Sequence, residues 1–323
     1  MTLPTALDVY QARRRIAPHV RRTPLIGSAW LSSVADATVS LKLESLQETG
    51  SFKFRGAMNA VLRLTEGGQL EGVAAVVTAS AGNHGRALAL AAERVGVRAV
   101  VFTPATAPEV KKVAIRRHGA DLMDDALDYD AAEASAREFA QSEGLLYVSP
   151  YNHPDVIAGA GTVALEVVEE QPAVDAVLVP IGGGGLASGV GLAIRAAAPR
   201  AEIIAVEVAA STAFSSGLAE GRIVEVPVTH TLADGLAGNL EPDSMTFGLV
   251  QRLVDRVATV SEDELTRAMR GLASEERLIT EGAGAAAVAA VLSGDVIRPG
   301  QRAVVLVTGS NIDLAAFAPL LAG

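Results

Sequence analysis

Short apolar runs rich in valine and isoleucine recur along this chain, and they restrict its possible folds more than any other feature. These runs cover residues 39–43, 73–77, 99–102, 145–148, 176–179, 203–208 and 303–307. Segments with helical periodicity lie between most of them, at residues 55–64, 84–95, 108–118, 129–142, 156–170, 186–197 and 262–276. Near-continuous apolar strands that alternate with helices are typical of parallel sheets covered on both faces. The sequence therefore predicts an α/β protein.

The length of 323 residues corresponds to about two domains. Residues 73–149 make a compact run of strand–helix units, and we expect them to form a small mobile domain. Residues 1–72 and 150–323 would then together form a larger, discontinuous domain.

Composition excludes several classes of function. Lys and Arg number 27 against 37 Asp and Glu, and the net charge of −10 gives no positive field to attract nucleic acid. The absence of cysteine rules out disulfides, cysteine-ligated metals and thiol catalysis. No apolar stretch reaches the ~20 residues that cross a bilayer. We therefore expect a cytoplasmic protein with neither nucleic-acid nor membrane partners.

Two further helices are expected. The arginine-rich N-terminal segment is predicted to be a surface helix rather than a transit peptide, with Leu7, Ile16 and Val20 along its apolar side. The alanine-rich residues 282–292 are predicted to form a buried helix.

Four consecutive glycines, Gly182 to Gly185, follow one predicted strand and precede a helix that begins at Leu186. Glycines allow backbone N–H groups to approach a phosphate, and the helix N-terminus adds a partial positive charge. The turn is therefore predicted to bind phosphate. Gly182, Gly184 and Ala187 also fit a relaxed dinucleotide pattern with Glu207 as the ribose-binding acid, so a nicotinamide dehydrogenase is an alternative.

A lysine flanked by two phenylalanines is the candidate catalytic residue. Lys53 lies in the sequence Ser51-Phe52-Lys53-Phe54, where Ser51 is a suitable helix N-cap. Lys53 would then occupy the first helical turn. Desolvation and the positive end of a helix both lower the pKa of a lysine, and an unprotonated amine is what Schiff-base chemistry requires.

Two more motifs follow predicted strands, namely residues 80–85 (SAGNHG) and 308–311 (TGSN). The first offers a hydroxyl, an amide and backbone N–H groups suited to a carboxylate, although simple helix capping explains it equally well. Ligands of open α/β sheets bind beyond the carboxyl ends of strands. We therefore expect both motifs to lie beside the glycine turn.

In combination and in this order, the motifs resemble those of fold-type II pyridoxal-phosphate (PLP) enzymes of the serine/threonine dehydratase and serine racemase family. The resemblance extends from Arg22 to Asn311. It implies two open, mostly parallel twisted sheets flanked by helices, as in the tryptophan synthase β chain, and a homodimer.

The resemblance also implies a role for each motif. Lys53 would carry PLP covalently and act as general base. The other residues that would hold PLP are Phe52, Asn83, Gly182, Gly183, Gly184, Gly185, Leu186, Glu281 and Thr308. The substrate carboxylate would lie against Ser80, Ala81, Gly82, Asn83 and His84. Thr308 is a neutral partner for the pyridine nitrogen and should favour β-elimination over transamination.

The implied reaction is dehydration and deamination of a β-hydroxy amino acid, such as L-threonine or L-serine, to a 2-oxo acid and ammonia. Ala81 replaces the second serine that racemases carry, which favours a dehydratase over an amino-acid racemase. A lyase for hydroxyaspartate, phenylserine or a hydroxyectoine-pathway intermediate is a further alternative. A metal at Glu207 is doubtful, because Ala213 occupies the position of the second acid.

Residues 233–242 begin like this family and then diverge from it. Two interpretations remain open with equal weight. The segment shapes the pocket for the substrate side chain, or it is a surface loop.

Overall fold

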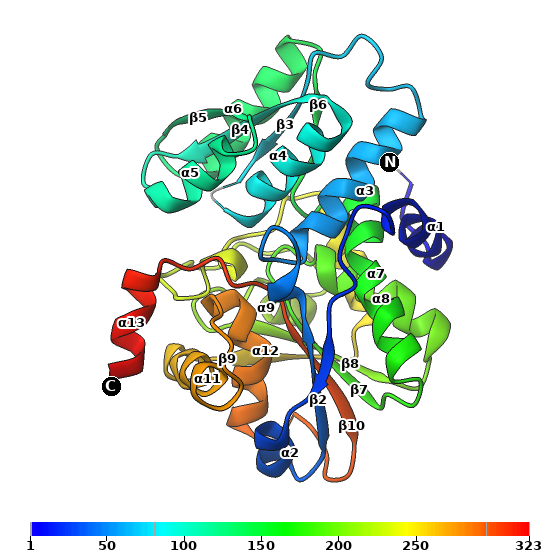
Figure 1. The fold of residues 1–323 in the computed structure, drawn as a ribbon, viewed down its shortest axis with the longest axis vertical. Helices are drawn as coiled ribbons and strands as arrows, with labels where there is room; N and C mark the ends of the chain where they lie inside the picture. The colour runs from blue at the N-terminus through cyan, green and yellow to red at the C-terminus, as the bar shows by residue number, and fades with distance from the viewer. Residues whose placement is uncertain (1, 81, 295, 323) are drawn as a thin grey trace.

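The computed structural model describes residues 2–80, 82–294 and 296–322 of the chain. It contains two sheets, and Figure 1 shows the smaller one above the larger one. The larger sheet has six strands in the order β1-β2-β10-β7-β8-β9, and only β1 runs antiparallel to its neighbour. Its strands are β1 (Leu25–Gly27), β2 (Thr38–Leu43), β10 (Arg302–Val307), β7 (Ala176–Pro180), β8 (Glu202–Val208) and β9 (Arg256–Val260).

Helices cover both faces of this sheet because successive side chains of each strand point to opposite sides. In β7, Val177 and Val179 pack in one core with α1, α7, α8 and α10, whereas Ala176 and Leu178 pack in another with α2, α11, α12 and α13. Figure 1 shows α7 and α8 on the side opposite α11 and α12. The first group is α1 (Ala6–Ile16), α7 (Pro154–Glu170), α8 (Gly185–Ala197) and α10 (Met245–Leu253). The second is α2 (Ala29–Ala35), α11 (Glu262–Glu275), α12 (Gly282–Ser293) and α13 (Leu314–Ala322).

The smaller sheet is entirely parallel, in the order β5-β4-β3-β6. Its strands are β3 (Ala75–Ala79), β4 (Arg98–Pro104), β5 (Asp121–Ala126) and β6 (Leu146–Tyr147). The helices on one face are α3 (Lys53–Glu66), α4 (Asn83–Val95) and α5 (Glu109–Arg116), and α6 (Tyr129–Ser142) lies on the other. The remaining helix, α9 (Ala213–Glu220), packs through Phe214 against the core around α8.

The predicted α/β class is confirmed, and each predicted apolar run overlaps a strand. The sequence missed β1, β5 and β9, which lie at sheet edges. Edge strands do not need apolar residues on both faces, and β5 (DLMDDA) is accordingly acidic and partly exposed.

Two local predictions are wrong. Leu7 is 64% exposed and Val20 lies beyond the end of α1, so that of the three predicted residues only Ile16 belongs to the buried side, with Val9 and Ala12. Ser51 does not cap the next helix; α3 begins at Lys53 with Phe52 as N-cap, and the Ser51 hydroxyl has no hydrogen-bond partner among the described residues. The boundaries at residues 72/73 and 149/150 remain a prediction.

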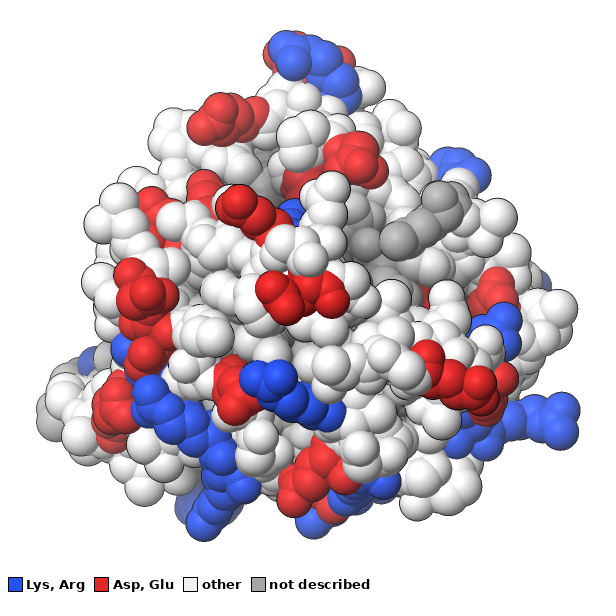
Figure 2. Space-filling view, turned by 90° about the horizontal axis from the view of Figure 1, so that it is seen from above, with Lys and Arg blue, Asp and Glu red and all other residues white. Residues whose placement is uncertain are grey.

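The surface carries charges of both signs. Acidic and basic side chains are interspersed on the face that Figure 2 shows. Of the helices in the described ranges, none combines the length and the apolar character that a membrane crossing requires.

A buried ionic cluster fixes α3 against the larger sheet. The guanidinium of Arg55 lies 2.8 Å from the carboxylates of both Glu44 and Glu166. Lys42 lies 2.8 Å from the second oxygen of Glu166 and donates to the carbonyl of Thr23. Burial by itself would lower the pKa of Arg55, but the two carboxylates raise it above its ordinary value. Arg55 is therefore charged and joins α3, the end of β2 and α7.

We expect Arg55→Ala to lower the free energy of unfolding by about 3–5 kcal/mol, because it leaves the buried Glu44 carboxylate without its cationic partner and Glu166 with Lys42 alone. Urea denaturation would measure the change. The control is Arg22→Ala, which removes half-exposed ion pairs with Glu169 and Glu170 and should cost less, about 1 kcal/mol. Equal losses for the two variants would contradict this account of the cluster.

Candidate active site

The sequence motifs converge where the carboxyl ends of the strands meet the starts of α3, α4 and α8. Ser51 pairs with Gly309 in an isolated bridge, and the Phe52 amide donates to the carbonyl of Thr308 at 3.1 Å. Asn83 reaches the same place from α4, because its amide oxygen accepts from Asn311 Nδ2 at 2.7 Å. The loop before Lys53, residues 308–311 and the start of α4 therefore converge, and Pro150 and Tyr151 connect Lys53 to Gly183 of the glycine turn.

Lys53 occupies the first turn of α3, as the sequence analysis expected. Its Nζ donates to the carbonyl oxygen of Pro150 at 2.9 Å and lies 5.3 Å from the ring centre of Phe52. Burial lowers the pKa of Lys53 to about 8, and the nearby Glu281 carboxylate opposes that shift. At pH 7 about a tenth of this amine is therefore unprotonated, far more than of an ordinary lysine.

Glu281 supplies the carboxylate of the cluster. It is the N-cap of α12, and its Oε1 accepts from Asn83 Nδ2 at 2.6 Å. Burial, followed by the charge of Asp234, raises the pKa of Glu281 to about 7. A Cβ on Gly309 would lie 2.0 Å from Glu281 Oε1, so only glycine leaves room for this carboxylate.

The loop before α4 provides polar groups that are not fully used. Ser80 Oγ accepts from the Gly82 amide at 3.2 Å, and Gly82 is the N-cap of α4. Both ring nitrogens of His84 are buried without a hydrogen-bond partner among the described residues. Burial and the neighbouring Lys53 lower the pKa of His84 to about 3, so this ring is neutral. Ala81, also predicted to contact substrate, lies outside the described residues.

The side chains of Tyr151 and Thr246 pack against the glycine turn. A Cβ on Gly183 would lie 2.3 Å from the ring of Tyr151, and Gly184 has a φ of +83° that favours glycine. Thr246 Oγ1 donates to the carbonyl of Gly183 at 2.8 Å. These contacts fix the backbone just where α8 begins, and Leu186 is buried in its first turn. The turn thus has the form of an anion-binding helix start.

Two predicted residues have partners within the protein. Thr308 is buried, and its hydroxyl donates to the carbonyl of Ala283 at 3.2 Å. The Glu207 carboxylate accepts from the amides of Phe214 and Ser215, each at 3.2 Å, and from the hydroxyl of Thr259. Glu207 therefore serves the start of α9, a structural role that the sequence analysis did not anticipate.

Sequence reasoning missed three contributors to the site. Asn311 was part of a recognised motif without an assigned role, and it orients Asn83. Pro150 contributes a carbonyl and Tyr151 a ring, and no motif signalled either residue.

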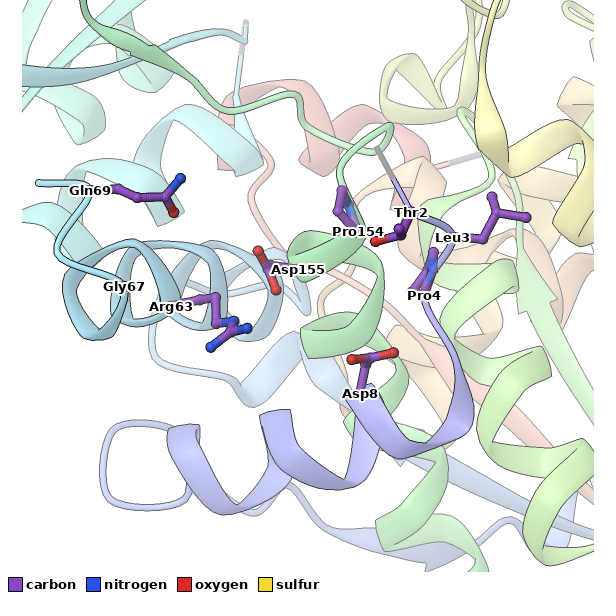
Figure 3. A pocket seen from close by; sticks show the side chains of 9 residues that line it. All are labelled: Thr2, Leu3, Pro4, Asp8, Arg63, Gly67, Gln69, Pro154 and Asp155. Atoms are coloured by element: carbon purple, nitrogen blue, oxygen red, sulfur yellow. The ribbon is translucent and has the colours of Figure 1, made fainter.

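A surface cavity of about 300 Å³ lies among the N-terminal segment, the end of α3 and the start of α7. Figure 3 shows Arg63, Asp155 and Asp8 on its walls. Asp8 already accepts hydrogen bonds from Thr5. None of the predicted cofactor residues lines the cavity, which is thus separate from the cluster around Lys53.

Similarity to known sequences extends over nearly the whole chain. The family described as pyridoxal-phosphate dependent enzyme matches residues 16–309. A putative threonine dehydratase from Sinorhizobium fredii is 42% identical over 308 residues, which cover 95% of this chain and 92% of the relative. An L-threonine ammonia-lyase from Geobacter sulfurreducens is 41% identical over 306 residues, covering 95% of this chain and 75% of the relative.

Solved structures have the same fold. A pyridoxal 5'-phosphate-dependent aspartate racemase superimposes with a TM-score of 0.91 at 33% identity, covering 98% of this chain and 99% of the other. A T.th. threonine deaminase gives a TM-score of 0.87 at 36% identity, covering 96% and 99%. The expected fold type is confirmed, and PLP rather than a nicotinamide is the cofactor of this group of proteins. Together with the geometry around Lys53, these similarities establish that the chain belongs to the pyridoxal-phosphate dependent enzymes.

Proposed function

We propose that this enzyme dehydrates and deaminates a β-hydroxy amino acid, with L-threonine and L-serine as candidate substrates. The observation that carries the proposal is the placement of Lys53, whose amine has a lowered pKa near the Glu281 carboxylate that accepts from Asn83. The threonine dehydratase and ammonia-lyase named above point to the same reaction. Net conversion releases ammonia and a 2-oxo acid: the β-hydroxyl leaves as water, and another water replaces the nitrogen.

The residues present fit PLP. The backbone N–H groups of the glycine turn at the start of α8 would bind the phosphate, and His84 and Ser51 carry buried polar atoms without partners among the described residues. Besides Lys53, the residues proposed to hold PLP are Phe52, Asn83, Gly182, Gly183, Gly184, Gly185, Leu186, Glu281 and Thr308. When bound, PLP supplies an electron-withdrawing ring that acidifies the substrate α-proton and promotes departure of the β-hydroxyl.

Lys53 Nζ is the proposed general base that accepts the α-proton. Burial favours the unprotonated amine, and an acceptor at the Pro150 carbonyl fixes its position. Glu281 opposes part of the desolvation and keeps the pKa of Lys53 at about 8 rather than lower. The amine can therefore both take and return a proton at neutral pH.

The start of α4 is the proposed seat of the substrate carboxylate. Ser80, Gly82, Asn83 and His84 lie there, and the helix N-terminus favours an anion. From the sequence we assign Ala81 to the same loop. Thr308 offers the cofactor a neutral hydroxyl in place of a carboxylate, which supports elimination over transamination.

The domain movement, the oligomeric state and the location of the enzyme are also proposed. Residues 73–149 would move as a small domain relative to residues 1–72 and 150–323. The active form would be a homodimer in the cytoplasm.

Racemisation is a second candidate because the aspartate racemase structure is so similar in fold. A racemase requires proton donors on both faces of the substrate, and Ala81 provides none in the carboxylate loop. Chiral analysis of L-serine and L-aspartate after incubation should therefore yield 2-oxo acid from serine and no D-enantiomer. Accumulation of a D-amino acid would favour the racemase instead.

The proposed roles of Lys53 can be tested directly. Purified enzyme should bind PLP, and borohydride should fix the cofactor on the peptide that contains Lys53, as measured by mass spectrometry. A panel of β-hydroxy amino acids should show 2-oxo acid release that falls by at least about 10³-fold in Lys53→Ala, because the general base is lost. Lys112→Ala, which removes a lysine of α5 that pairs with Asp124 of β5, is the control and should retain activity. Full turnover by Lys53→Ala would refute the assignment.

The effect of Glu281 on the pKa of Lys53 can be tested in the PLP-free protein. Glu281→Gln keeps an acceptor for Asn83 but removes the negative charge that raises the pKa of Lys53, so that pKa should fall below about 8. Because the pKa of Glu281 is itself about 7, the difference should be evident above that pH, where the native residue is charged. The pH dependence of the rate of Lys53 acylation gives the pKa of Lys53. Glu109→Gln, at an exposed glutamate, is the control. An unchanged or higher pKa would show that Glu281 does not act on this amine.

A further inference from the structure

Residues 233–242, which the motifs left unexplained, place one carboxylate against the strand–helix connection beside Lys53. Glu241 Oε1 accepts from Ser149 Oγ at 3.1 Å, and Oε2 accepts from Asn152 Nδ2 at 2.7 Å. Its side chain is only 12% exposed, and Arg137 of α6 lies 2.8 Å from Oε2. Glu241 is therefore a largely buried charge with three partners.

The connection that Glu241 binds, residues 149–152, contacts the candidate cofactor site at two points. Pro150 accepts from Lys53 Nζ, and Tyr151 packs its ring on Gly183. These two residues lie between Ser149 and Asn152, the residues bound by the Glu241 carboxylate. In addition, the Glu241 amide donates to Tyr151 Oη at 3.0 Å, and the Met245 amide donates to Asn152 Oδ1 at 3.0 Å.

Arg137 links this arrangement to the smaller sheet. Its guanidinium also pairs with Glu133 and lies 4.4 Å from the ring centre of Tyr147. A largely buried carboxylate is stable only while its donors remain in place, so the bonds to Glu241 favour one position of α6 relative to the glycine turn.

We propose that Glu241 is a positioning residue for the cofactor site, acting through the connection 149–152. It holds the acceptor of the Lys53 amine and the ring that backs the phosphate turn at a fixed separation. This inference rests on the proposed function, because it assumes that PLP occupies the space between Lys53 and the glycine turn.

The test compares cofactor affinity with stability. Glu241→Ala should raise the dissociation constant for PLP, titrated into cofactor-free enzyme by fluorescence, by roughly tenfold or more, since it removes buried hydrogen bonds to a charged group. Asn152→Ala should also raise the dissociation constant for PLP. In the Glu241→Ala/Asn152→Ala double variant this constant should rise by less than the product of the two single fold-changes, because both substitutions remove the same hydrogen bond. Asp121→Asn, which breaks an exposed pair with Arg98 on the smaller sheet, is the control and should leave the constant unchanged.

Thermal unfolding of the cofactor-free variants separates positioning from general stabilisation. If Glu241→Ala unfolds at a lower temperature but binds PLP as tightly as the native chain, the residue is structural and the inference is overturned. If Glu241→Ala does not fold, Asn152→Ala and Ser149→Ala carry the same prediction, and native affinity in both would overturn it. Native enzyme titrated in parallel must bind PLP and release 2-oxo acid; failure there would overturn the proposed function as well.

Discussion

The site depends on the balance of two effects on the pKa of the Lys53 amine. Burial lowers the pKa of Lys53 to about 8, and the Glu281 carboxylate prevents a larger shift. Burial alone favours the neutral form of each group, and the charge of each opposes that shift in the other. Asn83 and Gly309 then set where the carboxylate lies, one by a hydrogen bond and the other by having no side chain.

The fold supplies this environment by bringing the ends of distant strands together. Parallel strands place their carboxyl ends at one edge, and that edge of the larger sheet carries the loops before α3 and α8 and after β10. The smaller sheet contributes the start of α4 from above. The buried ion pairs of Arg55 anchor α3, and they therefore also fix the position of Lys53, two residues earlier in the same helix.

Much of this organisation could be predicted from the sequence. The central strands are marked by valine and isoleucine because both of their faces are buried, and Gly182 to Gly185 mark the turn at the start of α8. Edge strands such as β5 gave no such signal. The roles of Pro150 and Tyr151 could not be foreseen either, since a backbone carbonyl and a packing ring leave no motif. Similarly, Glu207 had the position of a ligand-binding acid, and only the structure shows that it binds amides of α9.

A crystal structure of the protein grown with PLP is the most direct measurement of the central claim. The account predicts continuous density from Lys53 Nζ to the cofactor and a phosphate against the amides of the glycine turn at the start of α8. Density for PLP at another lysine, or a Lys53 side chain that points into solvent beside an empty glycine turn, would contradict it.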